Sequence, residues 1–479
     1  MKRFTLLFLA AFLIFTVSCA SANGTEEKFD VDFSDFEGQV DLHGYNFQFR
    51  FYTLYSRGED SLFGYKESSN FYDAALKRVR DVENSLNCKI SLTNHSTADL
   101  ESNFAAVIMS GIYFRDAVMT DSWNLRPLIE GELFEPLSEV ADILDYTKSE
   151  KWGSWKNIEQ CVWNGELYGV TPVLWPEVAM TTGYAFAFNE KYAGLLGQPD
   201  PREYVETNVW TREKLGEMMR TYTTDDLGYP LKGGMAYDGH FYDAALRANN
   251  VQVYKYVNGT YVSGYHTPEG QEVFEWADNF MHNEYADCMI PCNSIQDDER
   301  QQRFINGECA MLFSSGSNIY GATSAIAYEV EDYCVLPMPN GPERAKVTSE
   351  YSTFMENVKN TLLFPRNGNI EYSAYIADAL FEPLEGFSKE ELDDYYLRFV
   401  YHDERDYALM QQLYKNNRCS FISDGVRGNV VEKLYVNHAG TVTSVLEATE
   451  EMQNTIVREK LIPTASSLEA IFGVEALMN

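Results

Sequence analysis

Hydrophobic and polar positions follow two different periods in the segment after residue 40. Three phenylalanines alternate with polar residues over 46–54, which predicts a strand. Apolar residues then recur at helical spacing over 71–86, which predicts an amphipathic helix. A strand at 88–92, a helix at 100–109 and a short buried strand at 117–119 are predicted next. This alternation of strands and helices indicates an open α/β sheet.

The middle and the end of the chain continue the same pattern. Thr211 is the predicted N-cap of one helix, and Thr267 followed by Pro268 begins another, with proline at the first helical position. The last 50 residues are predicted to be mostly helical. No internal repeat is visible, so the chain is not predicted to be a solenoid.

The N-terminus has the features of a secretory signal. Lys2 and Arg3 precede an apolar stretch over 4–15, and a small residue stands directly before Cys19. The apolar stretch is too short to span a bilayer, so we predict that residues 1–18 are a signal peptide. Residues 19–40 are rich in acids and small polar residues and are predicted to be a flexible tether.

The signal sequence resembles a bacterial lipobox, although Thr16 stands where leucine is commoner. The resemblance implies cleavage before Cys19 and lipidation of its thiol, and an ordinary signal peptide cut elsewhere is the alternative. Two or more acyl chains would hold the protein stably on a membrane.

Length and charge narrow the possible fold and the possible partners of the remaining 440 or so residues. A chain of this size is too long for one ordinary core and predicts two lobes. Its hydrophobic content of 45% excludes a disordered protein. The formal charge is −34, and loss of Lys2 and Arg3 makes it −36 (−34 − 2). Such a surface repels phosphate groups, so neither nucleic acid nor anionic lipid is an expected partner. No later segment is apolar for long enough to span a membrane.

Seven cysteines follow Cys19, and an odd number leaves at least one free thiol in a monomer. Cys288 and Cys292 are the only close pair, so a local disulfide is one interpretation and buried free thiols are the other. A metal site is disfavoured because His282 is the only nearby histidine. We therefore predict neither a metal nor a cofactor.

The common catalytic motifs, among them G-x-S-x-G, H-E-x-x-H, the P-loop and G-x-G-x-x-G, are absent from the sequence. We therefore predict that the protein is not an enzyme. Paired carboxylates of a glycoside hydrolase stay open as an alternative, because the chain has 72 acidic residues.

Several short segments, in order, resemble the family 1 extracellular solute-binding proteins of ABC importers. The resemblance covers roughly residues 41–380, and the later region fits only by its helical content. Ile370 stands where the family usually has proline. The segments are Asp41–Asn46, Ala106–Gly111, Asp116–Met119, Trp163–Pro172, Tyr184–Lys191, Phe304–Met311, Leu336–Pro342 and Asn369–Leu380.

The resemblance implies a two-lobed α/β fold of the periplasmic-binding-protein-like type II class, with a ligand cleft between lobes that close about hinge crossovers. Lobe 1 is expected over 41–170 and 311–385, and lobe 2 over 171–310 and 386–479. A monomer is expected. It would be lipid-anchored on the outer face of the bacterial cell membrane, where it delivers a solute to an ABC permease.

A mono- or oligosaccharide is the expected solute, with a peptide or a polyol left open. An acidic amino acid is disfavoured because no arginines cluster near the candidate loops in the sequence. A hydrolytic enzyme acting on carbohydrate, and a surface polymer-binding or sensor lipoprotein, remain the alternative functions. The same cleft would serve all of them.

A sugar site needs aromatic faces and side chains that bond hydroxyl groups, and such residues follow several predicted strands. Trp175 is the sharpest candidate: Pro172 and Pro176 restrict its backbone, so we expect its ring to stack on the ligand. Packing of Trp175 between the lobes is the alternative. The full candidate set is Asp121, Trp123, Trp175, Glu177, Tyr237, Asp238, His240, Ser315, Tyr320 and Tyr351, with Ser314 beside it.

Overall fold

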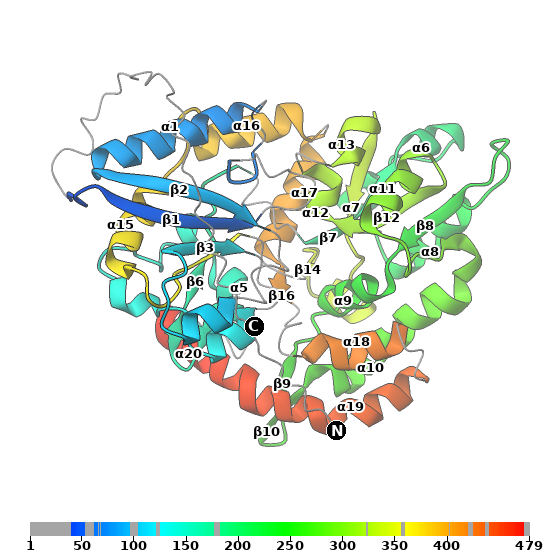
Figure 1. Ribbon diagram of the computed structural model, residues 1–479. Coiled ribbons are helices and arrows are strands. Elements are labelled where there is room, and N and C mark those ends of the chain that lie inside the picture. The colour runs from blue at the N-terminus through cyan, green and yellow to red at the C-terminus, as the bar shows by residue number, and fades with distance from the viewer. Residues whose placement is uncertain are drawn as a thin grey trace, which may run out of the picture. The chain divides into compact units, whose positions relative to one another are not determined.

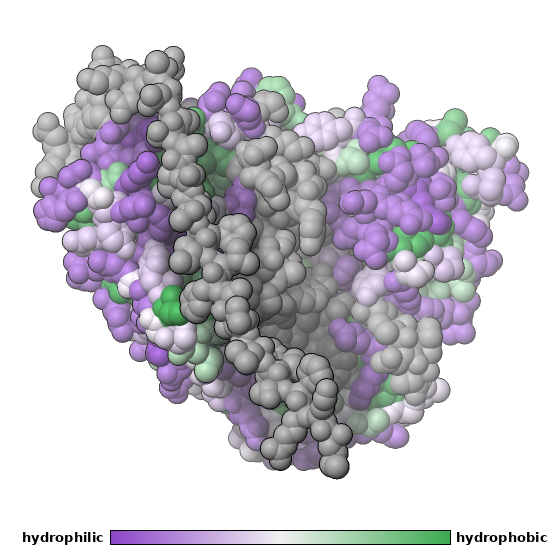
Figure 2. Space-filling model, viewed as in Figure 1, coloured by the Kyte–Doolittle hydropathy of each residue, from purple (hydrophilic) through white to green (hydrophobic). Residues whose placement is uncertain are grey.

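The computed structural model describes most of the chain after residue 39. The described residues are 40–52, 62–65, 67, 69–95, 104–120, 125–176, 183–321, 324–355, 360–401, 403–419, 425–435 and 440–473. The predicted signal peptide, Cys19 and nearly all of the tether lie outside them. In this part of the chain, no helix is both long enough and apolar enough to cross a membrane. The coloured atoms of the face in Figure 2 are mostly hydrophilic, as the formal charge of −34 leads us to expect.

The first of two five-stranded sheets has the strand order β2-β1-β3-β15-β6. β1 is parallel to β2 and β3, whereas β15 is antiparallel to β3 and β6. We call this sheet, with the helices on it, the first lobe (Figure 1). Its strands are β1 (Tyr45–Tyr52), β2 (Cys88–His95), β3 (Ala117–Thr120), β6 (Gly169–Val170) and β15 (Thr361–Leu363).

The second sheet has the order β11-β8-β12-β7-β13. β8 is parallel to β11 and β12, and β7 runs antiparallel between β12 and β13. This sheet and its helices form the second lobe. Its strands are β7 (Tyr184–Asn189), β8 (Lys232–Ala236), β11 (Met289–Ile290), β12 (Cys309–Ser315) and β13 (Tyr333–Leu336).

The helices that periodicity predicted are present. α1 (Asn70–Ser85) buries the apolar face that its spacing predicted, and the Ser69 hydroxyl accepts a hydrogen bond from the Tyr72 amide at 3.2 Å. Thr211 and Thr267 cap α8 (Arg212–Thr221) and α10 (Pro268–Asn279) as predicted. Local sequence therefore determines where these elements begin.

Shorter elements connect the two sheets and cover them. The helices are α3 (Leu125–Glu130), η2 (Leu137–Val140), α4 (Ser149–Trp152), α5 (Trp155–Ile158), η3 (Glu159–Cys161), α6 (Lys191–Leu195), α7 (Arg202–Glu206), α9 (Asp238–Ala248), η4 (Gly264–His266), η5 (Phe280–Glu284), η6 (Ala286–Cys288), α11 (Asp297–Ile305), α12 (Gly316–Tyr320), α13 (Ala325–Glu329), α14 (Pro342–Ala345) and α15 (Ile370–Leu380). The small strands are β4 (Val162–Trp163), β5 (Glu166–Leu167), β9 (Tyr254–Val257), β10 (Thr260–Ser263), β14 (Phe354–Met355) and β16 (Arg418–Cys419).

The second crossover between the lobes lies later in the chain than we predicted. The expected boundary at residue 311 is wrong, because β12 pairs with β7 and β8, and β13 then joins the same sheet. The chain returns to the first sheet only at β15, so the crossover lies between Leu336 and Thr361. An apolar strand looks the same in sequence whichever sheet receives it, which explains the error.

The C-terminal helices contact both lobes, so assigning all of 386–479 to the second lobe is also wrong. α16 (Lys389–Phe399) lies beside α1 in Figure 1, with the rings of Phe71 and Tyr395 5.2 Å apart. α19 (Val442–Ile456) packs on α10 and β10, but α20 (Ile462–Phe472) packs on β4 and β5 of the first lobe. α17 (Glu404–Lys415) and α18 (Val426–Tyr435) contact the second lobe.

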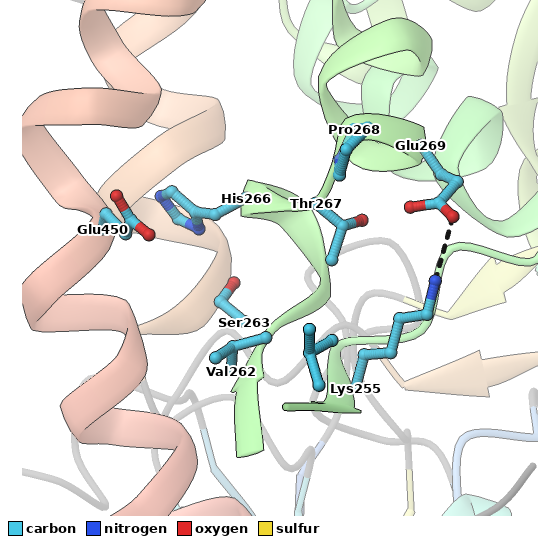
Figure 3. Close-up of a pocket in the computed structure, with 9 residues that line it drawn as sticks. Lys255, Val262, Ser263, His266, Thr267, Pro268, Glu269 and Glu450 are labelled. Carbon is cyan, nitrogen blue, oxygen red and sulfur yellow. Dashed lines mark hydrogen bonds and ion pairs between the residues drawn. The ribbon is translucent and has the colours of Figure 1, made fainter. Parts of the chain in front are cut away.

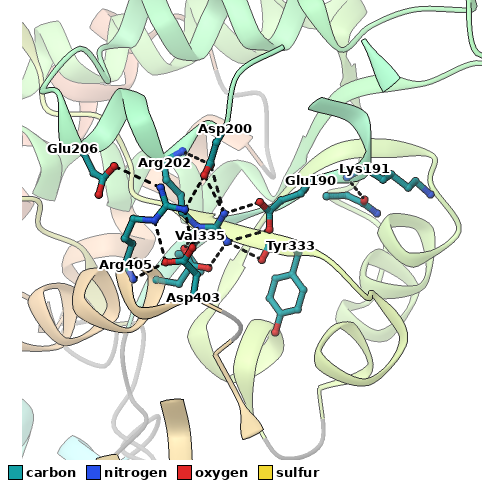
Figure 4. A network of polar contacts seen from close by, with 11 residues as sticks. Glu190, Lys191, Asp200, Arg202, Glu206, Tyr333, Val335, Asp403 and Arg405 are labelled. Atoms are coloured by element: carbon teal, nitrogen blue, oxygen red, sulfur yellow. Dashed lines mark hydrogen bonds and ion pairs between the residues drawn. The ribbon is translucent and has the colours of Figure 1, made fainter. Parts of the chain in front are cut away.

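A buried ion-pair network fastens α17 to the second sheet (Figure 4). The Arg202 guanidinium donates to Asp406 at 3.0 and 2.8 Å and to Glu190 at 2.6 and 3.0 Å. Asp406 also accepts from the Val335 amide of β13 at 3.1 Å. Burial raises the pKa of Asp406, and the hydrogen bonds from Arg202 oppose that rise. Arg405 pairs with Asp200 and Asp403 at the half-exposed edge of the network.

The two crossovers are joined where Gly183 meets Thr353. The Thr353 hydroxyl accepts from the Tyr184 amide at 2.9 Å and donates to the Tyr184 carbonyl at 2.7 Å. Gly183 has φ +79, and a Cβ there would lie 2.3 Å from the Thr353 methyl carbon. Glycine is therefore required at 183 by both its backbone conformation and the close approach.

The possible disulfide between Cys288 and Cys292 is not formed, because both thiols are free and buried. They behave as small apolar side chains, which was the other interpretation. Among the described residues, no group of histidine, cysteine or acidic side chains could hold a metal ion.

Candidate functional site

The carboxyl ends of β8, β11 and β12 meet at one edge of the second sheet. β8 and β12 are in register at Ala236 and Phe313, and β7 begins at the same edge because Tyr184 pairs with Ser315. The residues that follow these strands are therefore brought together at this edge, as expected in open α/β sheets. Tyr237, Asp238, His240, Ser314 and Ser315 all come from these strand ends.

Aromatic rings gather at this edge, and we call Tyr184, Tyr237, His240, Phe313 and Phe354 the ring cluster. Tyr184 stacks on Phe354 with ring centroids 4.5 Å apart and planes at 8°. The His240 ring lies 4.3 Å from Tyr184 and 4.7 Å from Tyr237. The Tyr184 hydroxyl is 3.2 Å from His240 Nε2, so polar atoms accompany the ring faces. Tyr237 is the half-buried ring of the cluster and presents it to the surface, whereas the other four rings are buried behind it. The guanidinium of Arg300 lies 5.2 Å from the Tyr237 ring.

Asp238 holds the start of α9 in place. Its carboxylate accepts from the Asn293 amide nitrogen at 2.7 Å and lies 3.0 Å from His282 Nε2. The hydrogen bond with Asp238 is the main cause that raises the pKa of His282, because it stabilises the protonated imidazole. Asp238 lies at the edge as predicted, but part of its hydrogen-bonding capacity is already used by the protein.

Ser314 and Ser315 lie at the start of α12. The Ser315 hydroxyl accepts from the Asn318 amide at 3.4 Å, and the Ser314 hydroxyl accepts from the Asn318 side chain at 3.0 Å. Ser315 is therefore the N-cap of a short helix, and it lies on the same sheet edge as Tyr184.

Trp175 lies in the core of the first lobe, so the prediction that it stacks on a ligand is wrong for this structure. Its side chain has no exposed surface, and its ring lies 5.0 Å from Phe63 and 5.2 Å from Phe381. Its Nε1 donates to the Glu382 carbonyl at 3.0 Å. The alternative, in which Trp175 packs against the protein itself, is closer to what is found. The neighbouring rings nevertheless belong to one lobe and not to both.

Tyr320 and Tyr351 are also buried by the protein itself, which corrects their prediction as ligand contacts. The Tyr320 ring lies 4.2 Å from Tyr401, and burial raises its pKa well above the usual value. The Tyr351 side chain is 5% exposed, and burial raises its pKa to about 12. Both residues lie beside α17: the Tyr351 backbone amide donates to Gln412 Oε1 at 2.9 Å, and Asp406 is a charged neighbour of Tyr320.

Three of the candidates, Asp121, Trp123 and Glu177, lie outside the described residues. Conversely, Tyr184, Phe313 and Phe354 belong to the ring cluster but were not in the candidate set. Tyr184 could have been found from sequence, since an antiparallel strand that follows a crossover begins where the parallel strands end. Phe354 joins the cluster from the second crossover, which the sequence placed too early.

A separate pocket lies between the β9–β10 hairpin, the start of α10 and α19 (Figure 3). On one side Lys255 pairs with Glu269 at 3.0 Å. On the other, His266 Nε2 is 3.0 Å from the Thr449 hydroxyl, and burial lowers the pKa of His266 to about 4. The imidazole is thus neutral at pH 7, and its contact with Thr449 joins the residues that follow the hairpin to α19. The pocket contains none of the predicted site residues.

Several solved solute-binding proteins share this fold. An ABC substrate-binding protein from Listeria monocytogenes in complex with cycloalternan has a TM-score of 0.55 at 14% identity, with 87% of this chain and 98% of that chain covered. The GacH receptor of Streptomyces glaucescens, solved unliganded and with acarbose, has a TM-score of 0.57 at 12% identity, with 87% and 99% covered. The maltotriose binding protein of Thermus thermophilus, bound with maltotriose, has a TM-score of 0.52 at 13% identity, with 86% and 99% covered.

The predicted fold class is therefore confirmed: the chain has the two-lobed α/β fold of these proteins, each of which is described as a binding protein or receptor rather than an enzyme. No family model and no curated protein matches the sequence.

Proposed function

We propose that the chain is the solute-binding protein of an ABC importer and that it captures a carbohydrate between its two lobes. The ring cluster at the carboxyl edge of the second sheet is the observation that carries this proposal. Aromatic faces pack on the C–H faces of a sugar, and nearby hydroxyl and imidazole groups bond its hydroxyls. Carbohydrate ligands in three proteins of the same fold support the same class of solute.

A carbohydrate-hydrolysing enzyme is the weaker alternative. Such an enzyme needs one carboxyl group as an acid and a second as a base or nucleophile. Asp238, the acidic candidate in the described part of this edge, is engaged by Asn293 and His282. A polymer-binding or sensor role would use the same edge, and the fold shared with ABC substrate-binding proteins favours transport.

The sugar prediction can be tested by titration calorimetry with neutral and acidic mono- and oligosaccharides, and with short peptides as a comparison. We expect a saccharide to bind, and we expect Tyr237→Ala to weaken its binding about 10- to 30-fold, because an aromatic face of this kind contributes about 1.5–2 kcal/mol. Tyr237 is the N-cap residue of α9, but its side chain does not cap the helix, so α9 should still form in the variant.

Tyr256→Ala is the matched control, because Tyr256 is 63% exposed on the β9–β10 hairpin. This variant should bind the saccharide with the affinity of the wild type. Binding of peptides in place of every saccharide would reject the carbohydrate proposal. Equal affinity of the Tyr237 variant and the control would instead remove Tyr237 from the site.

The proposed location is the outer face of the bacterial cell membrane, with an ABC permease as partner and a lipid anchor at Cys19. The sequence of the first 19 residues supports the anchor. Cys19→Ala should move the protein from the membrane fraction to the soluble fraction, because the acylated thiol supplies the apolar contact with lipid. A variant of Ser18 that keeps a small residue is the control. Equal membrane retention of Cys19→Ala and the wild type would contradict the anchor.

A further inference from the structure

Four cationic side chains from distant segments approach one another beside the crossovers. Lys156 is on α5, Arg247 on α9, Arg344 on α14 and Arg418 on β16, and we call them the basic cluster. Arg247 is within electrostatic range of Arg418 and Arg344, and Lys156 is within range of Arg247 and Arg418. Contacts of α5 with β16 and of α9 with β14 hold these segments together. The cluster is notable in a chain with a formal charge of −34.

Acidic side chains only partly compensate this cluster. Glu159 is fully buried and lies 3.4 Å from Arg418 Nη2, and Lys156 and Arg247 are its other cationic neighbours. Arg344 bonds the Ser352 hydroxyl at 2.6 Å. Glu350 is an acidic neighbour of Arg344, so the four cations outnumber the two acidic side chains that accompany them in the described part of the chain.

Arg247 is the member with unused donors. Its Nε and Nη1 are buried, and neither has a hydrogen-bond partner among the described residues. Burial, and then the charge of Arg418, lowers the pKa of Arg247 to about 10. Glu159 is an acidic neighbour of Arg247, but the two buried donors of Arg247 still make no hydrogen bond among the described residues. Buried donors without partners destabilise the free protein, so the arrangement calls for an explanation outside the fold itself.

The basic cluster lies on the same helix as the ring cluster. His240 and Arg247 are seven residues apart on α9, so they share a face of the helix about 10 Å apart. Aromatic side chains also accompany the cations: Arg418 lies 5.0 Å from the Trp155 ring, and Tyr254 and Tyr265 are electrostatic neighbours of Arg418 and Arg247. An oligosaccharide lying on the ring cluster can therefore extend to the basic cluster.

We infer that the solute is an anionic carbohydrate, whose carboxylate, sulfate or phosphate group accepts hydrogen bonds from Arg247 and is attracted by Lys156 and Arg418. This inference rests on the proposed function and narrows it to acidic sugars. Guanidinium groups match such anions in geometry, and their charge-assisted hydrogen bonds are the strong ones. The bound anion accepts the hydrogen bonds that Arg247 Nε and Nη1 do not make among the described residues.

The experiment compares charged and uncharged forms of the same sugars. Titration calorimetry is run with trigalacturonate and its methyl ester, with glucose 6-sulfate and glucose 6-phosphate against glucose, and with maltotriose as a further neutral sugar. We expect at least one acidic saccharide to have a Kd at least about 10-fold lower than that of its neutral counterpart. This difference in affinity is about what one charged hydrogen bond contributes. Comparison of the carboxylate in trigalacturonate with the sulfate and phosphate of the substituted glucoses shows which anionic group the site prefers.

Variants then assign the binding to the cluster. Arg247→Gln should weaken binding of the acidic saccharide about 30-fold and leave binding of a neutral sugar unaffected. The melting temperature of the unliganded variant should not fall, since buried donors without hydrogen-bond partners are removed. Lys156→Gln is the second variant, and it should weaken binding of the acidic saccharide less, by about 3- to 10-fold. Arg398→Gln, at an exposed site on α16, is the matched control and should bind like the wild type.

The failure of this inference is distinct from failure of the proposed function. Binding of neutral saccharides alone, or equal binding of acidic saccharides by Arg247→Gln and the wild type, would overturn the inference and leave the sugar receptor standing. Equally tight, Arg247-dependent binding of inorganic phosphate would make the site one for free anions, which also overturns it. Absence of binding by every saccharide would reject both.

Discussion

Trp175→Ala is expected to lower the free energy of unfolding by about 3–5 kcal/mol, the usual effect of removing a large buried aromatic side chain. The ring fills a site between Phe63 and Phe381, and its loss leaves a cavity that these rings close only in part. The Glu382 carbonyl also loses its hydrogen bond from the indole. Denaturant unfolding of the unliganded protein measures this effect.

Trp175→Phe is the graded control, since it keeps an aromatic ring and removes the indole nitrogen. We expect Trp175→Phe to lower the free energy of unfolding by about 1–3 kcal/mol, less than the alanine variant, because the ring is smaller and the hydrogen bond is lost. Both variants, where folded, should bind saccharide with nearly wild-type affinity. A variant with normal stability and weakened affinity would show that Trp175 contacts the ligand after all.

Arg202→Met should lower the free energy of unfolding by about 3–5 kcal/mol as well, for an electrostatic reason. The substitution leaves the buried carboxylate of Asp406 without its guanidinium partner, and this carboxylate also holds the Val335 amide of β13. α17 should therefore detach from the second sheet more readily. Denaturant unfolding followed by circular dichroism tests this expectation.

The same network offers its own controls. Arg405→Met should cost less than about 1 kcal/mol, because Arg405 is more exposed and solvent screens its ion pairs. The double variant Arg202→Met and Asp406→Leu should recover much of the free energy of unfolding that Arg202→Met loses, because it removes both buried charges together. Equal effects of the Arg202 and Arg405 substitutions would contradict the distinction between buried and exposed pairs.

Periodicity and capping residues predicted the elements whose stability is decided locally. α1 buries Phe71, Ala75, Val79 and Val82 as its spacing indicated, and α10 begins at its threonine cap and first-turn proline. Sheet membership was harder, because β12 is apolar at nearly every position and nothing in its sequence distinguishes β7 from β15 as a neighbour. The boundary at 311 failed for that reason.

The candidate site was predicted in part. Tyr237, Asp238, His240 and Ser315 lie at one sheet edge, because they directly follow parallel strands, a relation that sequence order reveals. The direction of the Trp175 ring depends on partners from other parts of the chain, and no local pattern determines it.

The basic cluster could not be predicted from the sequence, since its members lie on four separate elements. The arginines are not clustered along the sequence, which disfavours an acidic amino acid as ligand. The fold brings arginines together all the same, so spacing along the chain was a poor guide to charge in space.

The contact between Gly183 and Thr353 has a consequence for how this protein can change over evolutionary time. Any larger residue at 183 would meet the threonine methyl group, and a residue without a hydroxyl group at 353 would lose the hydrogen bonds to both backbone groups of Tyr184. Neither position can vary freely without loss, so the glycine and the hydroxyl residue should be retained together. In relatives too divergent for overall identity to be informative, a glycine and a hydroxyl residue at these two places would be a more durable mark of common descent.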